Sequence, residues 1–392
     1  MEKNKKVSFN TLAIHGAGQN DQNQSLNDPI YMTSTFTFKD LDQADDTFSF
    51  KRRAYVYTRG GNPTINLFEK RVALLESGVD SVAFASGMAA ITSTILSNVK
   101  AGDEIIFHKT LYGSAYGFIT HILPKYSVNA IACDFTKLNE VESLISPKTK
   151  LIYFETPTNP SMEIIDIKEI SKIAKRQNVK VVVDNTFATP YFQRPLELGA
   201  DIVIHSATKY ISGHGDALGG ITTSKDQDYI YHLKFGYMCE LGGVISPFNA
   251  WLMLRGIKTL GIRMKKIEEN AKLLANFLLK STKVEKVLYP GIETHNGYDI
   301  AKKQMDGFGG VLSFELQGDL KRAKDFVSRL KMIKLAVSLG DTETLVEIPA
   351  LMTHRDYSEP KLEEFGFSKK TIRISCGIED IDDILEDVSK AL

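Results

Sequence analysis

The sequence predicts an α/β fold in which a large domain with a mostly parallel sheet precedes a smaller α+β domain. From about residue 80, short apolar runs alternate with stretches of helical periodicity, and from about residue 255 a long helical connection leads into sparser strands. Because 392 residues exceed the usual size of one core, at least two domains are expected. We expect an N-terminal arm over 1–60, the large domain over 61–254 and the second domain over 255–392.

The arm lacks sustained periodicity and is rich in polar and aromatic residues, as in YMTSTFTFKDLDQADDTFSF. A segment of this composition cannot bury a core of its own, so it is expected to be extended and to lie on another surface. A neighbouring subunit could supply that surface.

Six apolar runs predict the strands of the large sheet, namely SVAFAS, DEIIFH, VNAIACD, KLIYFET, VKVVVDNT and ADIVIHSATK. A helix is expected between the runs KLIYFET and VKVVVDNT. Asp166 is its N-cap, and one helical face behind it is shared by Ile167, Ile170, Ile173 and Ala174. Strands buried on both faces and joined by helices are typical of parallel sheets. Such sheets bind ligands at the carboxyl ends of their strands, which makes the residues there candidates for chemistry.

The second domain begins with a long helical connection over SPFNAWLMLRGIKTLGIRM. Strands are expected at VLSFEL, IKLAVSLG and TIRISC, followed by a terminal helix in EDIDDILEDVSKAL. In that helix Ile381, Ile384, Leu385 and Val388 recur at helical spacing.

Charge and cysteine content narrow the classes of partner. The 48 basic side chains balance 48 acidic ones, so no net field for nucleic acid or an anionic membrane is expected. Cys133, Cys239 and Cys376 lie far apart and outside any C-x-x-C or Cys/His array, which argues against a disulfide framework or a metal site. Neither a leader-like segment nor a membrane-length apolar run is seen. We expect a cytoplasmic protein with a small-molecule ligand.

Lys209 ends a buried run, close to the hydroxyls of Ser206 and Thr208 and without a carboxylate beside it in sequence. An amine held among hydroxyl and apolar groups has a lowered pKa, which favours carbonyl chemistry and Schiff-base formation. The alternative is a lysine that ends a strand in solvent.

Three other strand ends carry candidate groups. Asp184 closes the run VVVD, where a buried carboxylate needs a positive partner, although a helix-capping role is equally expected. The strand end at Ser86, Gly87 and Met88 opens a helix whose N-terminus suits a phosphate, although Ser-Gly is common in such turns. Arg373 could bind a carboxylate with its planar fork, or lie on a solvated sheet face. Together with Lys209, these groups fit one cofactor, pyridoxal 5'-phosphate (PLP).

The sequence resembles the PLP-dependent enzymes of cysteine and methionine metabolism, the trans-sulfuration enzymes. Its most specific stretch is DIVIHSATKYISGHGD, and six further motifs match in the same order: YTRGGNPT, FASGMAA, KTLYGS, ETPTNP, VVVDNTFATP and SLGDTETL. The resemblance implies PLP fold type I, which is the aspartate aminotransferase-like fold, and a homotetramer made of two dimers.

The resemblance also implies a role for each matched residue. Lys209 would bind the cofactor covalently and, once freed, carry protons between substrate carbons. Asp184 would hold the ring nitrogen, while Tyr112 would stack on the ring and protonate the leaving sulfur. The phosphate would be bound by Ser86, Gly87, Met88, Ser206 and Thr208, together with Tyr57 and Arg59 from the arm of the neighbouring subunit. The substrate carboxylate would be bound by Arg373, Ser338 and Asn159.

Positions near the substrate's γ group separate members of the family. Cystathionine lyases typically carry charged residues where this chain has Val56, Val337 and Gly117, so the distal charges of cystathionine would be unpaired here. An apolar pocket suits the thiomethyl group of methionine, and SLGDTETL is closest to methionine γ-lyases. Two departures are Ser114, where many of those lyases have cysteine, and Met238-Cys239, where they have Lys-Asp.

Three functions are therefore compatible with the sequence. The first is γ-elimination from L-methionine or homocysteine, giving a thiol, ammonia and 2-oxobutanoate. The second uses the same site as an O-acetylhomoserine sulfhydrylase, a cystathionine γ-synthase or a cystathionine γ-lyase. The third is a non-catalytic binding protein, because a fold alone does not establish activity.

Overall fold

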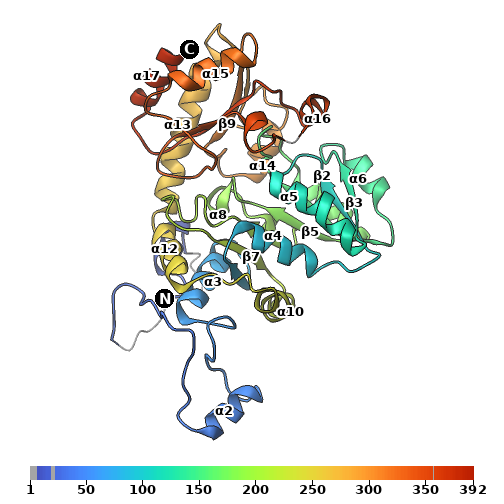
Figure 1. Cartoon of the computed structure of the whole chain (residues 1–392), viewed down its shortest axis with the longest axis vertical. Coiled ribbons are helices and arrows are strands. Elements are labelled where there is room, and N and C mark those ends of the chain that lie inside the picture. The colour runs from blue at the N-terminus through green and yellow to red at the C-terminus, as the bar shows by residue number, and fades with distance from the viewer. Residues whose placement is uncertain (1–6, 19–22, 356) are drawn as a thin grey trace.

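The computed structural model of the chain describes residues 7–18, 23–355 and 357–392. A seven-stranded sheet forms the centre of a large domain, and a five-stranded sheet forms the centre of a smaller one that carries the C-terminus (Figure 1). The predicted fold class, a mostly parallel sheet followed by an α+β domain, is confirmed.

The large sheet has the strand order β1-β7-β6-β5-β4-β2-β3. Neighbouring strands from β6 to β3 run parallel, and β7 is antiparallel to both β1 and β6. Its strands are β1 (Asp80–Phe84), β2 (Glu104–His108), β3 (Asn129–Cys133), β4 (Thr149–Glu155), β5 (Lys180–Asp184), β6 (Ile202–His205) and β7 (Gly220–Ser224). All six predicted strands are present.

Strand β7 is the member of the sheet that the sequence pattern did not predict. Its residues GITTS form no apolar run, yet all five are buried. Their hydroxyls are satisfied inside the protein, since Thr223 Oγ1 lies 2.8 Å from Ser81 Oγ and Thr222 Oγ1 lies 2.9 Å from Thr94 Oγ1. Paired hydroxyls therefore replace apolar side chains at this place.

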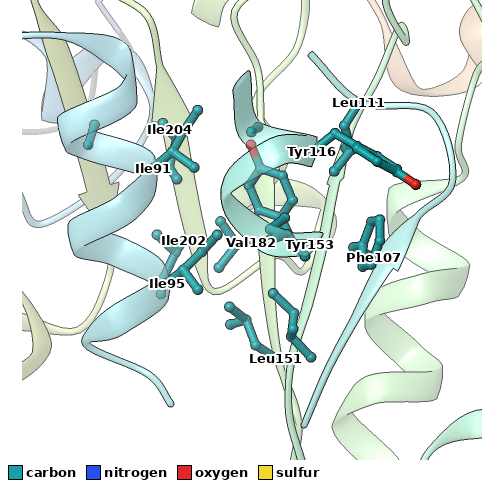
Figure 2. Close-up of a cluster of buried hydrophobic side chains, with 14 of the residues drawn as sticks. Ile91, Ile95, Phe107, Leu111, Tyr116, Leu151, Tyr153, Val182, Ile202 and Ile204 are labelled. Atoms are coloured by element: carbon teal, nitrogen blue, oxygen red, sulfur yellow. The ribbon is translucent and has the colours of Figure 1, made fainter. Parts of the chain in front are cut away.

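Helices cover both faces of the large sheet. On one face, Ile91 and Ile95 of α4 (Gly87–Leu96) pack over alternate strand residues such as Tyr153, Val182 and Ile204 (Figure 2). On the other face, α7 (Ile167–Arg176) begins at Asp166, whose side chain accepts from the Glu169 N–H at 3.0 Å. The predicted helix and its N-cap are confirmed.

The remaining helices of the large domain connect these strands or border the sheet. They are α3 (Pro63–Leu75), α5 (Gly113–Gly117), α6 (Leu138–Leu144), α8 (Thr189–Phe192), α9 (Pro195–Leu198), α10 (Gln227–His232), α11 (Cys239–Leu241) and α12 (Pro247–Ile257). Short π or 3-10 segments lie at Phe118–Ile122, Leu123–Tyr126 and Leu233–Met238.

The N-terminal arm contains more helix than expected, in α1 (Phe9–His15) and α2 (Leu41–Phe48). Helix α2 forms because Asp40 caps it, accepting from the Gln43 N–H at 2.8 Å. It projects away from both domains (Figure 1), and its Leu41 and Phe48 side chains are exposed. The arm therefore presents apolar side chains to the outside of this chain.

The second domain follows the predicted helical connection, which consists of α12 and the long α13 (Leu260–Leu279). Its sheet has the order β10-β11-β12-β9-β8. The strands are β8 (Val284–Leu288), β9 (Val311–Leu316), β10 (Lys334–Leu335), β11 (Leu345–Glu347) and β12 (Ile372–Ser375), and the helices are α14 (Tyr298–Gln304), α15 (Leu320–Arg329), α16 (Glu359–Glu364) and α17 (Ile381–Ala391), with a 3-10 turn at Pro349–Leu351. The terminal helix is confirmed, with Ile384 and Val388 buried.

The strand predicted over IKLAVSLG is wrong in its length. Only Lys334 and Leu335 pair as β10, and the chain leaves the sheet before Ser338, whose φ is +119°. Extended strands need a negative φ, so the backbone at Ser338 cannot continue the ladder. Over the described residues, no helix is both long and apolar enough to cross a membrane, and no cluster of three or more possible metal ligands occurs.

Candidate active site

Lys209 lies in the turn that follows β6, at the carboxyl edge of the large sheet. Its Nζ donates a hydrogen bond of 2.7 Å to Ser338 Oγ, which comes from the second domain. Gly340 packs directly against this turn, because a Cβ at Gly340 would lie 2.6 Å from the Tyr210 backbone nitrogen. The two domains therefore meet at the lysine.

The surroundings of Lys209 favour a neutral amine. Burial, and secondarily the positive charge of Arg373, lower the pKa of Lys209 to about 8, although Glu347 and Asp341 oppose this shift. A substantial share of the amine is then neutral near pH 8. The side chain is partly buried and so does not end a strand in open solvent.

Arg373 of β12 is 3% exposed, which excludes the alternative of a solvated sheet face. Its Nη1 pairs with Glu347 Oε1 at 2.8 Å and donates to Asn159 Oδ1 at 3.0 Å. Its Nη2 donates to the Ser338 carbonyl at 2.6 Å. Arg373 Nε and Glu347 Oε2 are buried without a hydrogen-bond partner in the described parts of the chain. A further acceptor, such as a ligand carboxylate, could satisfy that Nε.

Ser338 connects the lysine to the arginine. Its hydroxyl accepts from Lys209 while its carbonyl accepts from Arg373. Serine rarely adopts a φ of +119°, so the backbone is strained at this residue. Interactions on both sides of Ser338 hold it in this conformation.

Asp184 ends β5, next to the lysine-bearing strand. Its Oδ1 accepts from Thr186 twice, from the N–H at 3.0 Å and from Oγ1 at 2.5 Å. Thr186 Oγ1 also accepts from the Ser206 N–H at 2.9 Å, which ties Asp184 to the Lys209 turn. Burial raises the pKa of Asp184, against the effect of these hydrogen bonds. The carboxylate has no salt bridge within the described residues, so a cationic ligand group would stabilise it.

The start of α4 forms a compact anion-binding geometry. Ser86 caps the helix by accepting from the Ala89 N–H at 3.1 Å, and the N–H groups of Gly87 and Met88 lie in the first turn, where no intrahelical acceptor exists. A Cβ on Gly87 would lie 2.8 Å from Ser206 Cβ, so glycine permits the close approach of Ser206. Thr208 Oγ1 lies nearby in sequence but exchanges hydrogen bonds with Gly219, at 3.2 Å and 3.0 Å.

These groups fit PLP. A helix N-terminus with a hydroxyl suits its phosphate, a buried carboxylate without a counter-charge suits a protonated ring nitrogen, and an amine of lowered pKa suits its aldehyde. The set comes from β1, β5 and β6 of one sheet, at the edge where parallel strands bind ligands.

Other predicted residues lie around this set. Tyr112 immediately precedes α5 and is 40% exposed. Ser114 is exposed on α5, and Val337 is 54% exposed beside Ser338.

Tyr57 and Arg59 have their contacts elsewhere. Arg59 Nη1 donates to the Cys239 carbonyl at 3.2 Å, and Cys239 Sγ donates to the Arg59 carbonyl at 3.2 Å. Tyr57 is bridged to Thr35 within the arm, and its ring is exposed. No described contact links either residue to Lys209 or Ser86 of the same chain.

The sequence pattern missed two buried carboxylates at this site, Glu347 and Glu155. Glu155 ends β4 and is paired in register with Asp184. It could have been found by the rule that singled out the other strand ends, because it closes the run KLIYFE. No sequence signal marks Glu347, which is recognised only through its salt bridge to Arg373.

The profile of the Cys/Met metabolism PLP-dependent enzyme family matches residues 10–392. The chain is 44% identical to L-methionine gamma-lyase of Fusobacterium nucleatum over 99% of its length and 98% of that protein. It is 43% identical to cystathionine beta-lyase of Lactococcus lactis over 98% and 99% of the two chains. A crystal structure of a putative O-acetylhomoserine (thiol)-lyase from Campylobacter jejuni, which contains a pyridoxyl-lysine monophosphate, is 32% identical with a TM-score of 0.95, covering 98% and 99% of the chains.

Proposed function

Because the chain belongs to the Cys/Met metabolism PLP-dependent enzyme family, we propose that it is a carbon–sulfur lyase acting by γ-elimination on L-methionine. Methionine and water would give methanethiol, ammonia and 2-oxobutanoate. The observation that carries this proposal is the full-length similarity to L-methionine gamma-lyases, at 44% identity to the Fusobacterium nucleatum protein. Homocysteine, which has the same carbon skeleton and a γ-sulfur, is a second substrate of this proposal.

The proposal assigns cofactor binding to the residues at the carboxyl edge of the sheet. Lys209 would bind the aldehyde carbon, Asp184 the ring nitrogen and Tyr112 the ring face. Ser86, Gly87, Met88, Ser206 and Thr208 would bind the phosphate. The open N–H groups at the start of α4 and the unpaired carboxylate of Asp184 support this assignment. When bound, PLP supplies an electron sink that acidifies the carbons next to its attachment point.

Proton transfer falls to Lys209 and Tyr112. An amine with a pKa of about 8 exchanges protons readily near neutral pH, so Lys209 can take the α proton and then act at the β carbon. Tyr112, which directly precedes α5 and is 40% exposed, would act as the acid for the departing sulfur.

Substrate orientation falls to Arg373, Asn159 and Ser338. Arg373 is already held by three acceptors, and its remaining Nε is buried and unpaired. A substrate carboxylate would satisfy that group and fix the amino acid relative to Lys209. Val337, which adjoins Ser338, and Ser114 on α5 carry no charge, which favours a thiomethyl group over the charged end of cystathionine.

The second candidate is sulfhydrylation of O-acetylhomoserine, which would use the same residues. The observation in its favour is the near-complete structural match to the putative O-acetylhomoserine (thiol)-lyase of Campylobacter jejuni. The two functions differ in whether a sulfur nucleophile or water completes the reaction.

Steady-state assays with the purified PLP-loaded enzyme distinguish the two candidates. Methionine, homocysteine, cystathionine and O-acetylhomoserine with sulfide would each be offered, with thiol and 2-oxobutanoate release measured. We expect methionine to give methanethiol and 2-oxobutanoate in equal amounts. Turnover of O-acetylhomoserine with sulfide, with none of methionine, would reject the first candidate and support the second.

We further propose a cytoplasmic homotetramer in which Tyr57 and Arg59 complete the phosphate site of the neighbouring subunit. The exposed apolar side chains of the projecting arm, among them Leu41, Phe48 and Phe50, support an intersubunit contact. The three free buried cysteines are in keeping with a reducing compartment. Light scattering tests the assembly, and deletion of residues 1–60 should both reduce its mass and weaken PLP binding.

A further inference from the structure

We propose that Glu155 is a positioning residue of this active site, whose carboxylate fixes the backbone of Tyr112 relative to the carboxylate clamp formed by Asn159 and Arg373. The inference rests on the proposed function for the identity of the ligands that these groups face. It assigns to Glu155 no contact with the substrate or the cofactor.

Glu155 lies at the carboxyl end of β4, beside the proposed cofactor site. It is the last residue of β4 and is buried, and its register partner on β5 is Asp184. Paired residues of neighbouring parallel strands point to the same side of a sheet, so the two carboxylates face the same region. Glu155 thus lies next to the residue assigned to the cofactor's ring nitrogen.

Two backbone N–H groups converge on the Glu155 carboxylate. Its Oε1 accepts from the Asn159 N–H at 2.9 Å, and the backbone N–H of Tyr112 faces the same carboxylate closely enough to lower its pKa. These donors belong to separate loops, one after β4 and one after β2. A single side chain therefore links the loop that carries the stacking tyrosine to the loop that carries the clamp.

The link continues to the arginine. Asn159 Oδ1 accepts from Arg373 Nη1 at 3.0 Å, so the chain of contacts runs from Tyr112 through Glu155 and Asn159 to Arg373. Helix α5 begins directly after Tyr112 without a side-chain cap, and the helical segment continues through π and 3-10 turns to Tyr126. A contact at the Tyr112 N–H therefore acts on the residue from which this whole segment starts.

The electrostatic surroundings of Glu155 are unfavourable to a charge. Burial, followed by the charge of Asp184, raises its pKa to about 8, and the two N–H donors and Arg373 only partly oppose this. Tyr153, whose buried hydroxyl has no partner among the described residues, adds no compensation. A buried carboxyl group at this position lowers the stability of the folded protein. Its role is that its oxygens hold two loops in place.

Two substitutions separate the position of the acceptor from the ionisable carboxyl. Glu155→Gln keeps an oxygen at the same reach and removes the ionisable group, whereas Glu155→Asp keeps the ionisable group and withdraws the oxygen by one methylene. If Glu155 positions the loops, the aspartate variant should lose roughly 10- to 100-fold in kcat/KM, with KM raised, because buried N–H groups are left unpaired. The glutamine variant should lose much less, within about 5-fold.

The visible circular dichroism of bound PLP and its Kd from absorbance titration supply readouts that need no turnover. We expect the aspartate variant to change the dichroism of the bound cofactor, while its far-ultraviolet spectrum and dimer or tetramer mass stay those of the unmodified protein. The opposite ranking, with glutamine worse than aspartate, would show that the ionisable carboxyl matters more than the reach of the acceptor and would overturn the proposal. Equal kinetics and dichroism in both variants would overturn it too.

The failure of the proposed function would be distinguishable from the failure of this inference. If the unmodified enzyme does not turn over methionine, the kinetic comparison moves to the substrate that the panel identifies. The dichroism and Kd arms then still decide whether the reach of residue 155 sets the geometry of the cofactor site.

Discussion

Lys209 Nζ and Ser338 Oγ are joined by a hydrogen bond of 2.7 Å that crosses from the large domain to the second. The Ser338 carbonyl accepts from Arg373 at the same time, so the proposed reacting amine and the proposed substrate clamp are held by one residue. Any shift of the second domain relative to the sheet would separate them. The distance between the amine and the bound amino acid is thus set by how the domains pack.

The lowered pKa of Lys209 predicts how the cofactor-free protein loads PLP. Below about pH 8 the amine is mostly protonated and cannot attack an aldehyde, whereas above it the neutral form predominates. The rate of covalent loading should therefore rise as the pH increases from 7 to 9 and level off above. Stopped-flow absorbance measures this rate, with borohydride trapping and peptide mass spectrometry to locate the adduct. Lys209→Arg should give no adduct, and a rate midpoint near the ordinary lysine value would contradict the assignment.

Because the Glu347–Arg373 salt bridge is buried, we expect its loss to lower the stability of the protein much more than the loss of an exposed salt bridge would. Removing one partner of a buried pair leaves the other charge unpaired, so Glu347→Ala should destabilise the protein by about 3–5 kcal/mol and raise KM for the amino acid. The exposed pair of Lys390 and Glu386 is the control, and Glu386→Ala should cost less than about 1 kcal/mol. Thermal unfolding of the PLP-free proteins measures both. Similar midpoints for the two variants would contradict the prediction.

The helical and strand framework of this chain follows from local patterns, while its active site depends on contacts that no local pattern encodes. The alternation of apolar runs predicted six strands, and Asp166 predicted a helix start, because burial and capping act over a few residues. Strand β7 escaped because Thr222 and Thr223 are buried through partners that are distant in sequence. The IKLAVSLG strand was predicted too long because the conformation of Ser338 is set by Lys209 and Arg373, which come from other elements.

We expect Lys361 to hold the segment after the Pro349–Leu351 turn against α5. Its Nζ lies 4.6 Å from the Tyr116 ring centroid and 5.8 Å from that of Phe365, and it donates to the Tyr116 hydroxyl. Lys361→Met removes about 1–2 kcal/mol of cation–π attraction and should speed amide exchange in residues 357–367 and in α5. Hydrogen exchange with mass spectrometry measures it. Lys369→Met is the control, because Lys369 forms its salt bridge with the exposed Glu359; an equal effect there would contradict the role of the aromatic cluster.

Because Gly87 lies so close to Ser206, we expect that no larger residue fits at position 87 of the proposed phosphate site without a shift of the backbone. An alanine Cβ would lie 2.8 Å from Ser206 Cβ, so Gly87→Ala must push the lysine-bearing turn away from α4. We expect the Kd for PLP to rise at least about 10-fold, as a displaced anion site loses aligned donors. Absorbance titration of the cofactor-free protein measures it. At Gly236 a Cβ meets nothing closer than 3.5 Å, so Gly236→Ala should leave the Kd unchanged; a similar loss in both variants would refute the steric argument.

Because Val337 is uncharged and adjoins Ser338 of the proposed clamp, we expect substrate preference to depend on the absence of a charge at this position. Val337 is 54% exposed and immediately precedes Ser338, so under the proposed substrate orientation a side chain introduced there would lie near the distal end of the amino acid. Val337→Glu would offer a partner to the distal ammonium of cystathionine and place an unneeded charge near the thiomethyl group of methionine. Because truncating or adding one charge partner typically changes binding by about 1–3 kcal/mol, the ratio of kcat/KM for cystathionine to that for methionine should rise roughly 5- to 150-fold.

The matched control for that ratio is Val79→Glu, which adds the same charge to a half-exposed valine immediately before β1, at the strand end opposite Ser86. Competition assays with both substrates measure the ratio in one reaction mixture. If Val337→Glu lowers turnover of both substrates equally, the position affects folding or cofactor binding and does not select the substrate. If both variants raise the ratio, the effect comes from net charge, and the selectivity must lie in residues other than Val337.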